Sequence, residues 1–354
     1  MRRLKDFKLK SKKVLVRCDF NVPIKSGKIL DDFRIKKTIP TIKYLIKKRA
    51  KIILMSHLGK PKDREKEYSL KPIAKRLEKL LKRLRPAHHP PTKGGPQVKF
   101  LKDCIGKNVK QEVDKMKDGE IVLLENLRFQ KGEEKGDENF AKKLASLGDF
   151  FIEDAFATCH RSHASIVKLP KYLPSATGLL LESEIKNLGE IIEKPPLPLV
   201  AIFGGDDPDF RAIDKISEKA DWILIGGLIQ TAIEEKCIKL KYPEKIIKPI
   251  DSLNNEDIGE KTIKIFKEKI SRAKTVFWSG PFGKIEEKKF QKGTKEIVKA
   301  IIKSMAFSVV GGGETIDFIN DLGLGEKFNH LSTGGSAMLE FLAGEKLPGI
   351  EALK

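Results

Sequence analysis

The sequence predicts an α/β protein in which two parallel sheets form two separate domains. Apolar runs of strand length alternate with amphipathic helical segments along the whole chain, a pattern typical of parallel sheets. Most of these runs end in polar or glycine-rich turns. A chain of 354 residues is also longer than one ordinary domain, so two domains are expected.

Several segments have the composition of buried strands. In chain order they are Val14–Val16, Lys51–Met55, Ile121–Leu124, Phe150–Ile152, Leu199–Phe203, Trp222–Ile225, Thr275–Trp278 and Phe307–Val310. In open parallel sheets, ligands bind beyond the carboxyl ends of the strands. The turns that follow these segments should therefore form a functional edge on each sheet.

The first two strands are followed by side chains that suit an anion. Asp19 and Asn21 follow the first strand, and Arg34 lies in the link DDFRI after it. His57 and Lys60 follow the second strand, in SHLGKP. Packing alone does not explain two strand ends this polar, so we expect these side chains to converge on one small anionic molecule.

Two further strand ends in this half carry arginine and histidine. ENLRF places Arg128 beyond one strand, and TCHRSHAS places His160, Arg161 and His163 beyond the next. The planar fork of arginine suits carboxylate and phosphate oxygens, and histidine can donate to the same anion. Scattered surface charges or satisfied buried groups are the alternative, but the shared position at strand ends favours one anion site.

The second half begins after a helical segment, ESEIKNLGEIIEK, which Pro195–Pro198 ends. Glycine turns follow its strands, and Gly311–Gly313 before the helical IDFINDLG is the best nucleotide candidate, because a helix N-terminus stabilises phosphate. Glu314, directly after these glycines, could hold a magnesium ion that bridges phosphates. The motif GxxxxGK[ST] does not occur, so a P-loop enzyme is excluded.

The net charge of +21 has two interpretations. Nucleic-acid binding is one, but the charge is mostly lysine on the polar faces of amphipathic segments. We favour a lysine-rich surface, whose positive field also attracts a phosphorylated substrate. His88 and His89 lie in a Pro- and Gly-rich loop without other candidate ligands nearby, so metal binding is not expected there.

Cysteine usage and hydropathy suggest the compartment. The four cysteines are scattered and form no CxxC pair, which indicates neither disulfides nor zinc. No segment has the length and hydropathy of a membrane span or a signal core. We therefore expect a cytoplasmic, monomeric enzyme that binds neither nucleic acid nor membranes.

A series of ordered motifs is similar to those of phosphoglycerate kinase along nearly the whole chain. The motifs are VLVRCDFNVP, DDFRI, SHLGKP, LLENLRF, EDAF followed by HRSHAS, GLLLESEI, the Gly-Pro turn after FWS, VVGGGET and LSTGGSAMLEFLAGEKLPGIEAL. The resemblance implies two Rossmann-like lobes joined by a hinge helix. The substrate lobe would span residues 1–182, the hinge 183–198 and the nucleotide lobe 199–335, while residues 336–354 would return to the first lobe.

The resemblance also implies an activity and a set of site residues. The activity is reversible phosphoryl transfer in glycolysis between 1,3-bisphosphoglycerate and ADP, which gives 3-phosphoglycerate and ATP and uses Mg²⁺. The acid substrate would be held by Asp19, Phe20, Asn21, Arg34, His57, Lys60, Arg128 and Arg161. The nucleotide would contact Glu286, Gly312, Gly313, Glu314 and Thr315, with Glu314 as the metal ligand. Arg34 and Arg211 would be the catalytic cations.

The chain departs from the family pattern at one turn. GGDDPDFR stands where the family has GGAKVSDK, so Asp207 replaces an expected lysine and Arg211 only roughly replaces a second one. Loss of such a cation can cost ~10³–10⁵ in rate, by analogy with arginine fingers. We favour a degenerating turn over a rebuilt metal-dependent site. The alternative function is a catalytically impaired protein that binds the acid substrate. The segment between Ile238 and Pro249 is also too short by roughly a strand–helix unit.

Overall fold

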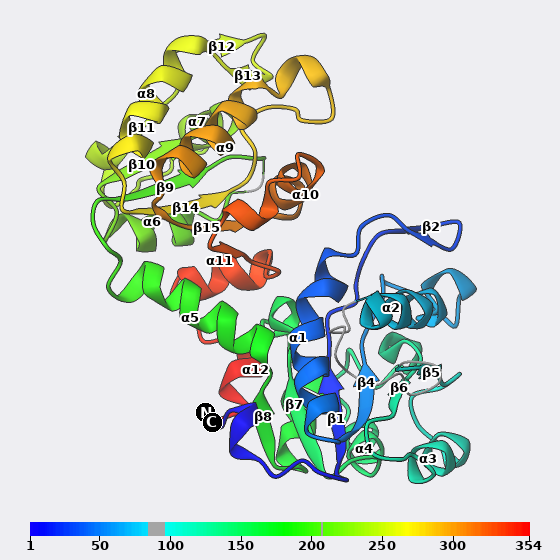
Figure 1. Cartoon of the computed structure of the whole chain (residues 1–354). Coiled ribbons are helices and arrows are strands. Elements are labelled where there is room, and N and C mark those ends of the chain that lie inside the picture. Colours follow the sequence, from blue (N-terminus) through cyan, green and yellow to red (C-terminus); the bar gives the residue numbers. More distant parts are fainter. Residues whose placement is uncertain (84–95, 207) are drawn as a thin grey trace. The chain divides into compact units, whose positions relative to one another are not determined.

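The computed structural model describes residues 1–83, 96–206 and 208–354. The chain forms two compact units: unit 1 comprises Met1–Ser183 and Leu347–Lys354, and unit 2 comprises Glu184–Lys346 (Figure 1). The boundary between the units falls inside one continuous helix, α5 (Leu179–Glu193). None of the helices in the described ranges is long and apolar enough to cross a membrane.

Unit 1 is built on a parallel sheet of six strands in the order β5-β6-β4-β1-β7-β8. The strands are β1 (Lys13–Arg17), β4 (Lys51–Met55), β5 (Val98–Phe100), β6 (Ile121–Leu123), β7 (Phe150–Glu153) and β8 (Ser175–Thr177), and a separate hairpin pairs β2 (Ile24–Lys25) with β3 (Lys28–Ile29). The chain moves from β1 to β4 on one side and later adds β7 and β8 on the other, so the winding reverses between β1 and β7. Ligands of open α/β sheets bind outside the strand ends at such a switch point.

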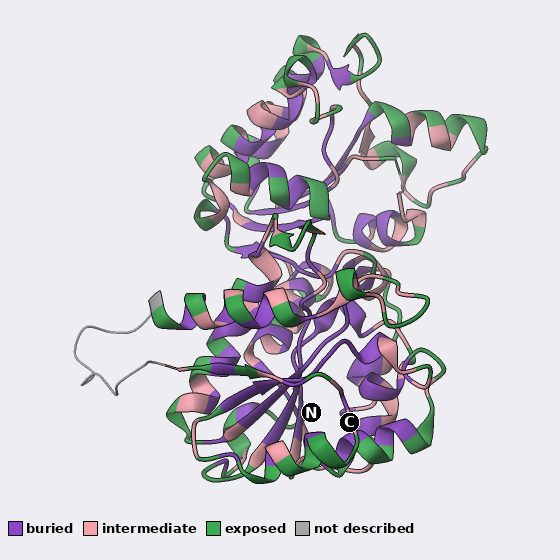
Figure 2. Ribbon diagram, turned by 90° about the vertical axis from the view of Figure 1, so that its right-hand side faces the viewer, coloured by how far each residue is buried: buried purple, intermediate pink, exposed green. Residues whose placement is uncertain are grey.

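Helices and turns cover both faces of this sheet. They are α1 (Phe33–Lys47), α2 (Lys71–Arg83), α3 (Lys107–Asp114), α4 (Glu138–Ala145), the π-helical turn η5 (Ala164–Lys168) and α12 (Pro348–Glu351). Val14 and Val16 pack into one core with apolar residues of α1 and α2. Their neighbour Arg17 faces the opposite side, where its Nε donates to Ser165 Oγ of η5 at 3.0 Å. The strands are buried and the helices expose their outer sides (Figure 2).

Unit 2 repeats the plan with a parallel sheet in the order β11-β10-β9-β14-β15-β16. Its strands are β9 (Leu199–Phe203), β10 (Trp222–Ile225), β11 (Ile246–Ile247), β14 (Thr275–Ser279), β15 (Phe307–Gly311) and β16 (His330–Leu331). Its helices are α6 (Phe210–Ser217), α7 (Gly227–Glu235), α8 (Glu260–Arg272), α9 (Lys292–Ser304), α10 (Gly313–Asp321) and α11 (Ser336–Leu342). A hairpin pairs β12 (Ser252–Leu253) with β13 (Asp257–Ile258). The switch point of this sheet lies between β9 and β14.

These two parallel sheets confirm the predicted fold class. Every segment predicted to be a strand is one, and its ends shift by no more than one residue. The sheet strands β5, β8, β11 and β16 and the strands of the two hairpins were not predicted, because strands of two or three residues are too short to show a periodicity.

Two regions bear on the predicted domain organisation. In the short segment between Ile238 and Pro249, the 3₁₀ turn Pro243–Lys245 leads into β11, which pairs with β10 in the sheet of unit 2. At the C-terminus, α11 belongs to unit 2, where a Cβ on Gly311 would lie 2.2 Å from Met338 Sδ. The return to unit 1 therefore begins at Leu347, later than the expected residue 336.

Candidate functional site

The carboxyl edge of the unit 1 sheet carries a connected set of polar side chains. Asp19 is fully buried just after β1, and its Oδ2 accepts a hydrogen bond from Arg34 Nη1 of α1. Its Oδ1 accepts from the backbone of Asn21 at 3.2 Å. Asn21 Oδ1 accepts in turn from Gly59 N, in the turn after β4, at 2.8 Å. These bonds join the ends of β1 and β4 and hold the half-buried Arg34 by one end of its guanidinium.

His57 is oriented by an arginine that the sequence analysis did not select. Arg17 ends β1 and is fully buried, and its Nη2 lies 3.3 Å from His57 Nδ1. An arginine can only donate, so Nδ1 is the acceptor and His57 carries its hydrogen on Nε2. Burial, followed by the charges of Arg17 and Arg128, holds the pKa of His57 well below its usual range. His57 is therefore a neutral donor with a fixed tautomer.

Arg128 is a second buried cation of this edge. Its side chain is 2% exposed, and Nη1 donates to Gly59 O. Nη2 is buried without a hydrogen-bond partner, and Nε lies 3.0 Å from Glu134 Oε1 outside hydrogen-bond geometry. Burial lowers the pKa of Arg128 from its usual value, although the guanidinium stays charged at neutral pH. A buried donor without a partner is costly, and an anion would satisfy it.

The segment after β7 completes the cluster. Arg161 is half-buried, and its Nε donates to His160 Nε2 at 3.2 Å, while His160 Nδ1 is buried without a partner. Burial, together with Arg128 and then Arg17, lowers the pKa of His163 to about 3. The histidines are thus neutral, and the arginines supply the positive charge of this edge.

The predicted substrate residues do not all present their side chains alike. Phe20 is fully buried in the core, and its N–H donates to Ser56 Oγ at 2.9 Å, so its ring is not available to a ligand. Lys60 is exposed beside Gly59. The sequence analysis missed Arg17 and the buried Glu133, whose Oε1 accepts from Ser165 Oγ at 2.6 Å. Arg17 carried a usable signal, since it is a charged residue that ends an apolar strand.

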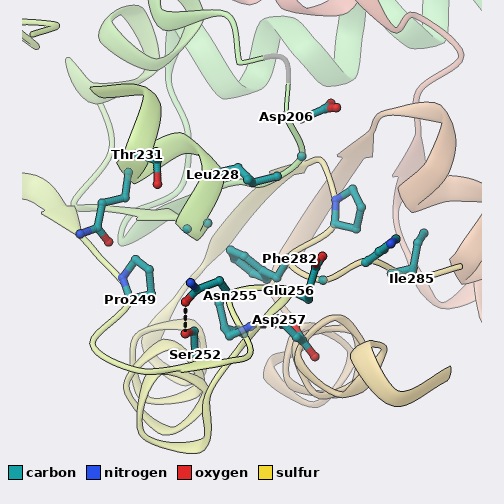
Figure 3. Close-up of a pocket in the computed structure, with 18 of the residues that line it drawn as sticks. Asp206, Leu228, Thr231, Pro249, Ser252, Asn255, Glu256, Asp257, Phe282 and Ile285 are labelled. Carbon is teal, nitrogen blue, oxygen red and sulfur yellow. Dashed lines mark hydrogen bonds between the residues drawn. The ribbon is translucent and has the colours of Figure 1, made fainter. Parts of the chain in front are cut away.

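Unit 2 contains a cavity of about 650 Å³ beside its own switch point (Figure 3). It is lined by Gly205 and Asp206 after β9, by residues of α7 and of the β12–β13 hairpin, and by the turn after β14. Glu286 and Glu314, two of the predicted nucleotide residues, also line it. Its volume is within the range of small-molecule sites.

Close backbone contact explains the glycines at this switch point. A Cβ on Gly204 would lie 2.2 Å from Pro281 O, and a Cβ on Gly280 would lie 2.1 Å from Gly204 O. Gly280 also has φ +85°, which favours glycine. The turn after β9 and the turn after β14 can approach this closely only without side chains.

The amino end of α10 offers donors to an anion. Gly312 has φ +87° and precedes the helix, and Gly313 and Glu314 form its first turn. The backbone N–H groups of a first helical turn have no intrahelical partner. Thr315 is fully buried, and its Oγ1 has no hydrogen-bond partner. Gly312, Gly313 and Thr315 lie beside Glu314 in the chain but do not line the cavity themselves.

The cavity carries an excess of carboxylates. Among the described lining residues, the acidic ones are Asp206, Asp251, Glu256, Asp257, Glu286 and Glu314, and the one cation is Lys284, which is paired with Glu287 at 2.9 Å. No described group of three or more His, Cys, Asp or Glu side chains forms a metal site by itself. Mg²⁺ is commonly held by one or two carboxylates together with substrate phosphates, and Glu314 fits that role.

Arg211 is held by carboxylates. Its Nη2 lies 2.9 Å from Asp209 Oδ2 and its Nη1 lies 3.6 Å from Glu345 Oε1. Asp209 also caps α6 through the backbone of Arg211 at 3.0 Å. The positive charge of Arg211 is therefore partly neutralised by Asp209 and Glu345. Asp207, His88 and His89 lie outside the described residues.

Comparison with known proteins gives one consistent result. A family model described as phosphoglycerate kinase matches residues 4–241 and 231–345. A phosphoglycerate kinase of Dictyoglomus turgidum is 42% identical over 400 residues, which covers 99% of this chain and 98% of that protein. One of Clostridium kluyveri is 42% identical over 401 residues with the same coverage.

Solved structures agree with these sequence matches. The phosphoglycerate kinase of Pyrococcus horikoshii superposes with a TM-score of 0.87 at 31% identity, over 100% of this chain and 98% of that one. The phosphoglycerate kinase of Coxiella burnetii gives a TM-score of 0.81 at 30% identity, over 99% and 98% of the two chains.

Proposed function

The chain belongs to the phosphoglycerate kinase family, and we propose that unit 1 binds the phosphorylated acid while unit 2 binds the nucleotide. The reaction is phosphoryl transfer to and from a carboxyl group, in glycolysis. The comparisons give the alternative of a catalytically impaired binding protein no support. The division of substrates between the units rests on the two polar strand-end sites described above.

One observation carries the assignment of unit 1. Arg128 Nη2 and His160 Nδ1 are buried and unpartnered at an edge that also holds Arg17, Arg34 and Arg161. 3-Phosphoglycerate has a carboxylate and a phosphate, whose oxygens can accept from several such donors at once. His57, neutral with its hydrogen on Nε2, adds a donor without adding charge. Arg17 Nε, Nη1 and Nη2 are already engaged by protein groups, so Arg17 supports the site through His57.

The chemistry needs no covalent enzyme intermediate. In the direction of ATP formation, a β-phosphate oxygen of ADP attacks the acyl phosphate, and the 3-phosphoglycerate carboxylate leaves. Catalysis then consists mainly of positioning and of cations that stabilise charge on the transferred group. We assign this role to Arg34, because Asp19 fixes one end of its guanidinium. Arg211 is the candidate on the nucleotide side, where Asp209 and Glu345 limit its charge.

ATP or ADP would occupy the cavity of unit 2. The proposal places its phosphates at the amino end of α10, near Gly312, Gly313 and Thr315, and its other groups near Glu286. When bound, Mg²⁺ would neutralise phosphate charge, with Glu314 as its protein ligand. The acidic lining makes such a cation necessary, because the carboxylates otherwise repel the phosphates.

Transfer requires the two ligands to meet, so we propose that residues 183–198, which begin within α5, act as a hinge. Closure would also exclude water from the acyl phosphate. We further propose that the enzyme works as a monomer in the cytoplasm, in keeping with four cysteines that form no disulfide.

A coupled assay of ATP formation tests this function. 1,3-Bisphosphoglycerate, ADP and increasing Mg²⁺ are supplied, and the expected result is turnover that stops when EDTA removes the metal. Absence of ATP formation at every Mg²⁺ concentration would contradict the proposed function. Turnover that is indifferent to EDTA would contradict the role of Glu314 and its metal.

A further inference from the structure

Two charged side chains lie side by side at the switch point of unit 1, fully buried. Arg17 ends β1 and Glu153 ends β7, and the two are register partners in the parallel pairing of these strands. Register partners point to the same face of a sheet, so guanidinium and carboxyl share one buried layer. That face is the one on which Arg17 contacts Ser165.

The two side chains do not satisfy each other. Arg17 donates to Ser165 Oγ, to Cys18 O and to His57 Nδ1. Glu153 Oε1 accepts from Ala155 N at 2.9 Å, but Oε2 is buried without any hydrogen-bond partner. An ionised carboxylate in that position would carry charge on an oxygen that accepts no hydrogen bond, which favours the neutral acid. Arg17 thereby keeps its charge for the anion site, through His57.

We infer that Glu153 is a positioning residue whose proton sets the strength of the anion site: neutral Glu153 leaves more of the charge of Arg17 uncompensated, and ionised Glu153 offsets it. This rests on the proposed function, in which unit 1 binds 3-phosphoglycerate. Binding the acid then draws a proton onto Glu153, because the bound anion and the carboxylate repel each other.

The surroundings set the pH window. Burial raises the pKa of Glu153 to about 8, with Arg17 opposing this shift. Below that pH the acid is neutral and the site is strong, and above it the site weakens. The titratable groups around Glu153 are Arg17, Cys18, Glu133 and Asp154. Burial raises the pKa of the Cys18 thiol well above 9.0, and the nearby His57, His160 and His163 have lowered pKa values. Cys18 and these three histidines therefore do not titrate near pH 8.

Asp154 provides a matched control on the next residue. It is also fully buried with one unpartnered oxygen, Oδ2, but its Oδ1 accepts from Leu180 N at 2.9 Å at the start of α5. A side-chain hydrogen bond to Thr41 places it towards α1, on the other face of the sheet. Substituting it tests whether any buried acid would serve.

The test is calorimetry of 3-phosphoglycerate binding between pH 7.5 and 9, in buffers of different ionisation enthalpy. In this range the ligand phosphate is already doubly ionised. The intact protein should take up close to one proton at pH 9, and its Kd should rise about eightfold across the range for a group that titrates near 8. Glu153→Gln keeps the hydrogen bond from Ala155 N. It should abolish both the proton uptake and the rise in Kd, so that the variant binds as tightly at pH 9 as it does at pH 7.5. Asp154→Asn should retain both.

Proton uptake that survives in Glu153→Gln, or is lost in Asp154→Asn, overturns the inference. Absence of 3-phosphoglycerate binding at every pH would instead refute the proposed function. In that case ¹³C NMR of the glutamate carboxyl groups in the intact protein, with and without inorganic phosphate, decides whether the proton of Glu153 responds to an anion. A resonance that titrates near pH 8, shifts upward with phosphate and is missing from Glu153→Gln supports it. A Glu153 that titrates near pH 4.5 overturns it.

Discussion

Substitution of Arg128 separates an effect on substrate binding from an effect on the stability of the fold. We consider Arg128→Met, which keeps an unbranched apolar stem in a site where the arginine is 2% exposed. On binding, the change removes a guanidinium whose Nη2 is buried and unpartnered. A charge-assisted hydrogen bond contributes ~1.5–3 kcal/mol, so 3-phosphoglycerate should bind roughly 10- to 150-fold more weakly.

The same change should cost the fold little. The variant loses the bond from Nη1 to Gly59 O and the contact with Glu134, which is 54% exposed. Together these contribute ~1.5–4 kcal/mol. Removal of the unpartnered donors recovers a desolvation cost of ~1–3 kcal/mol, so the free energy of unfolding should fall by only ~1 kcal/mol. The loss should be confined to binding.

Calorimetry with 3-phosphoglycerate and urea unfolding measure the two quantities on one sample. Arg49→Met is the matched control, because Arg49 is an exposed arginine just before β4, at the opposite edge of the same sheet. It should bind 3-phosphoglycerate as the unaltered protein does. Equal binding by Arg128→Met and Arg49→Met would refute the reasoning, and so would a loss of binding that merely follows a loss of stability.

Three further outcomes are expected. Asp206→Asn removes one exposed carboxylate from the acidic cavity, so ATP titrated at low Mg²⁺ should bind about 2- to 10-fold more tightly. The difference between the variant and the unaltered protein should shrink as the Mg²⁺ concentration rises. Equal affinity at low Mg²⁺ would count against electrostatic repulsion by Asp206. Glu153→Gln should change the pH dependence of stability. Because its pKa is raised, Glu153 keeps a proton in the folded protein that the unfolded chain loses above pH 4.5, so the unaltered protein loses stability as the pH rises towards 8, and the variant should be more stable there by up to ~4–5 kcal/mol. Thermal unfolding of the two proteins with the same pH dependence from pH 5 to 8 would exclude this. Gly204→Ala places a Cβ 2.2 Å from Pro281 O and should weaken ATP binding while leaving 3-phosphoglycerate binding unchanged, as paired titrations would show.

Strand ends made much of unit 1 predictable. Asp19, Asn21, His57 and Arg128 were selected because they follow apolar strands. At one edge of the sheet, hydrogen bonds connect Asp19, Asn21 and Arg128 through Gly59, and His57 contacts Arg17. The rule that ligands bind at the carboxyl ends of parallel strands is geometric, so it needs no knowledge of which side chains contact each other. It does not say which ligand binds at the strand ends of either unit. The ligand came from the resemblance.

Side-chain direction was not predictable in the same way. Phe20 stands between Asp19 and Asn21 in the motif, yet its ring is buried in the core. Arg17 was passed over although it orients His57, because a charged residue at the end of an apolar strand does not reveal which groups its side chain contacts. The neutrality of Glu153 depends on an unpartnered oxygen, which only tertiary packing determines.

The cavity of unit 2 was less accessible to sequence reasoning. Glycine turns pointed to the switch point, where Gly204 and Gly280 touch. The wall contributed by the β12–β13 hairpin, including Ser252 and Asn255 (Figure 3), comes from a stretch with no recognisable motif. Hairpins of two-residue strands carry too little pattern to be detected from composition.

Steady-state kinetics of two variants test the division of substrates most directly. Arg128→Met and Glu314→Gln are assayed in the direction of 1,3-bisphosphoglycerate formation, with 3-phosphoglycerate and MgATP varied in turn. Arg128→Met should raise the KM for 3-phosphoglycerate at least tenfold and leave the KM for MgATP within twofold, by the charge-assisted bond estimate. Glu314→Gln should do the reverse, with a KM for MgATP that partly recovers at high Mg²⁺. Variants that each raise both KM values together, or that each affect the substrate assigned to the other unit, would contradict the division.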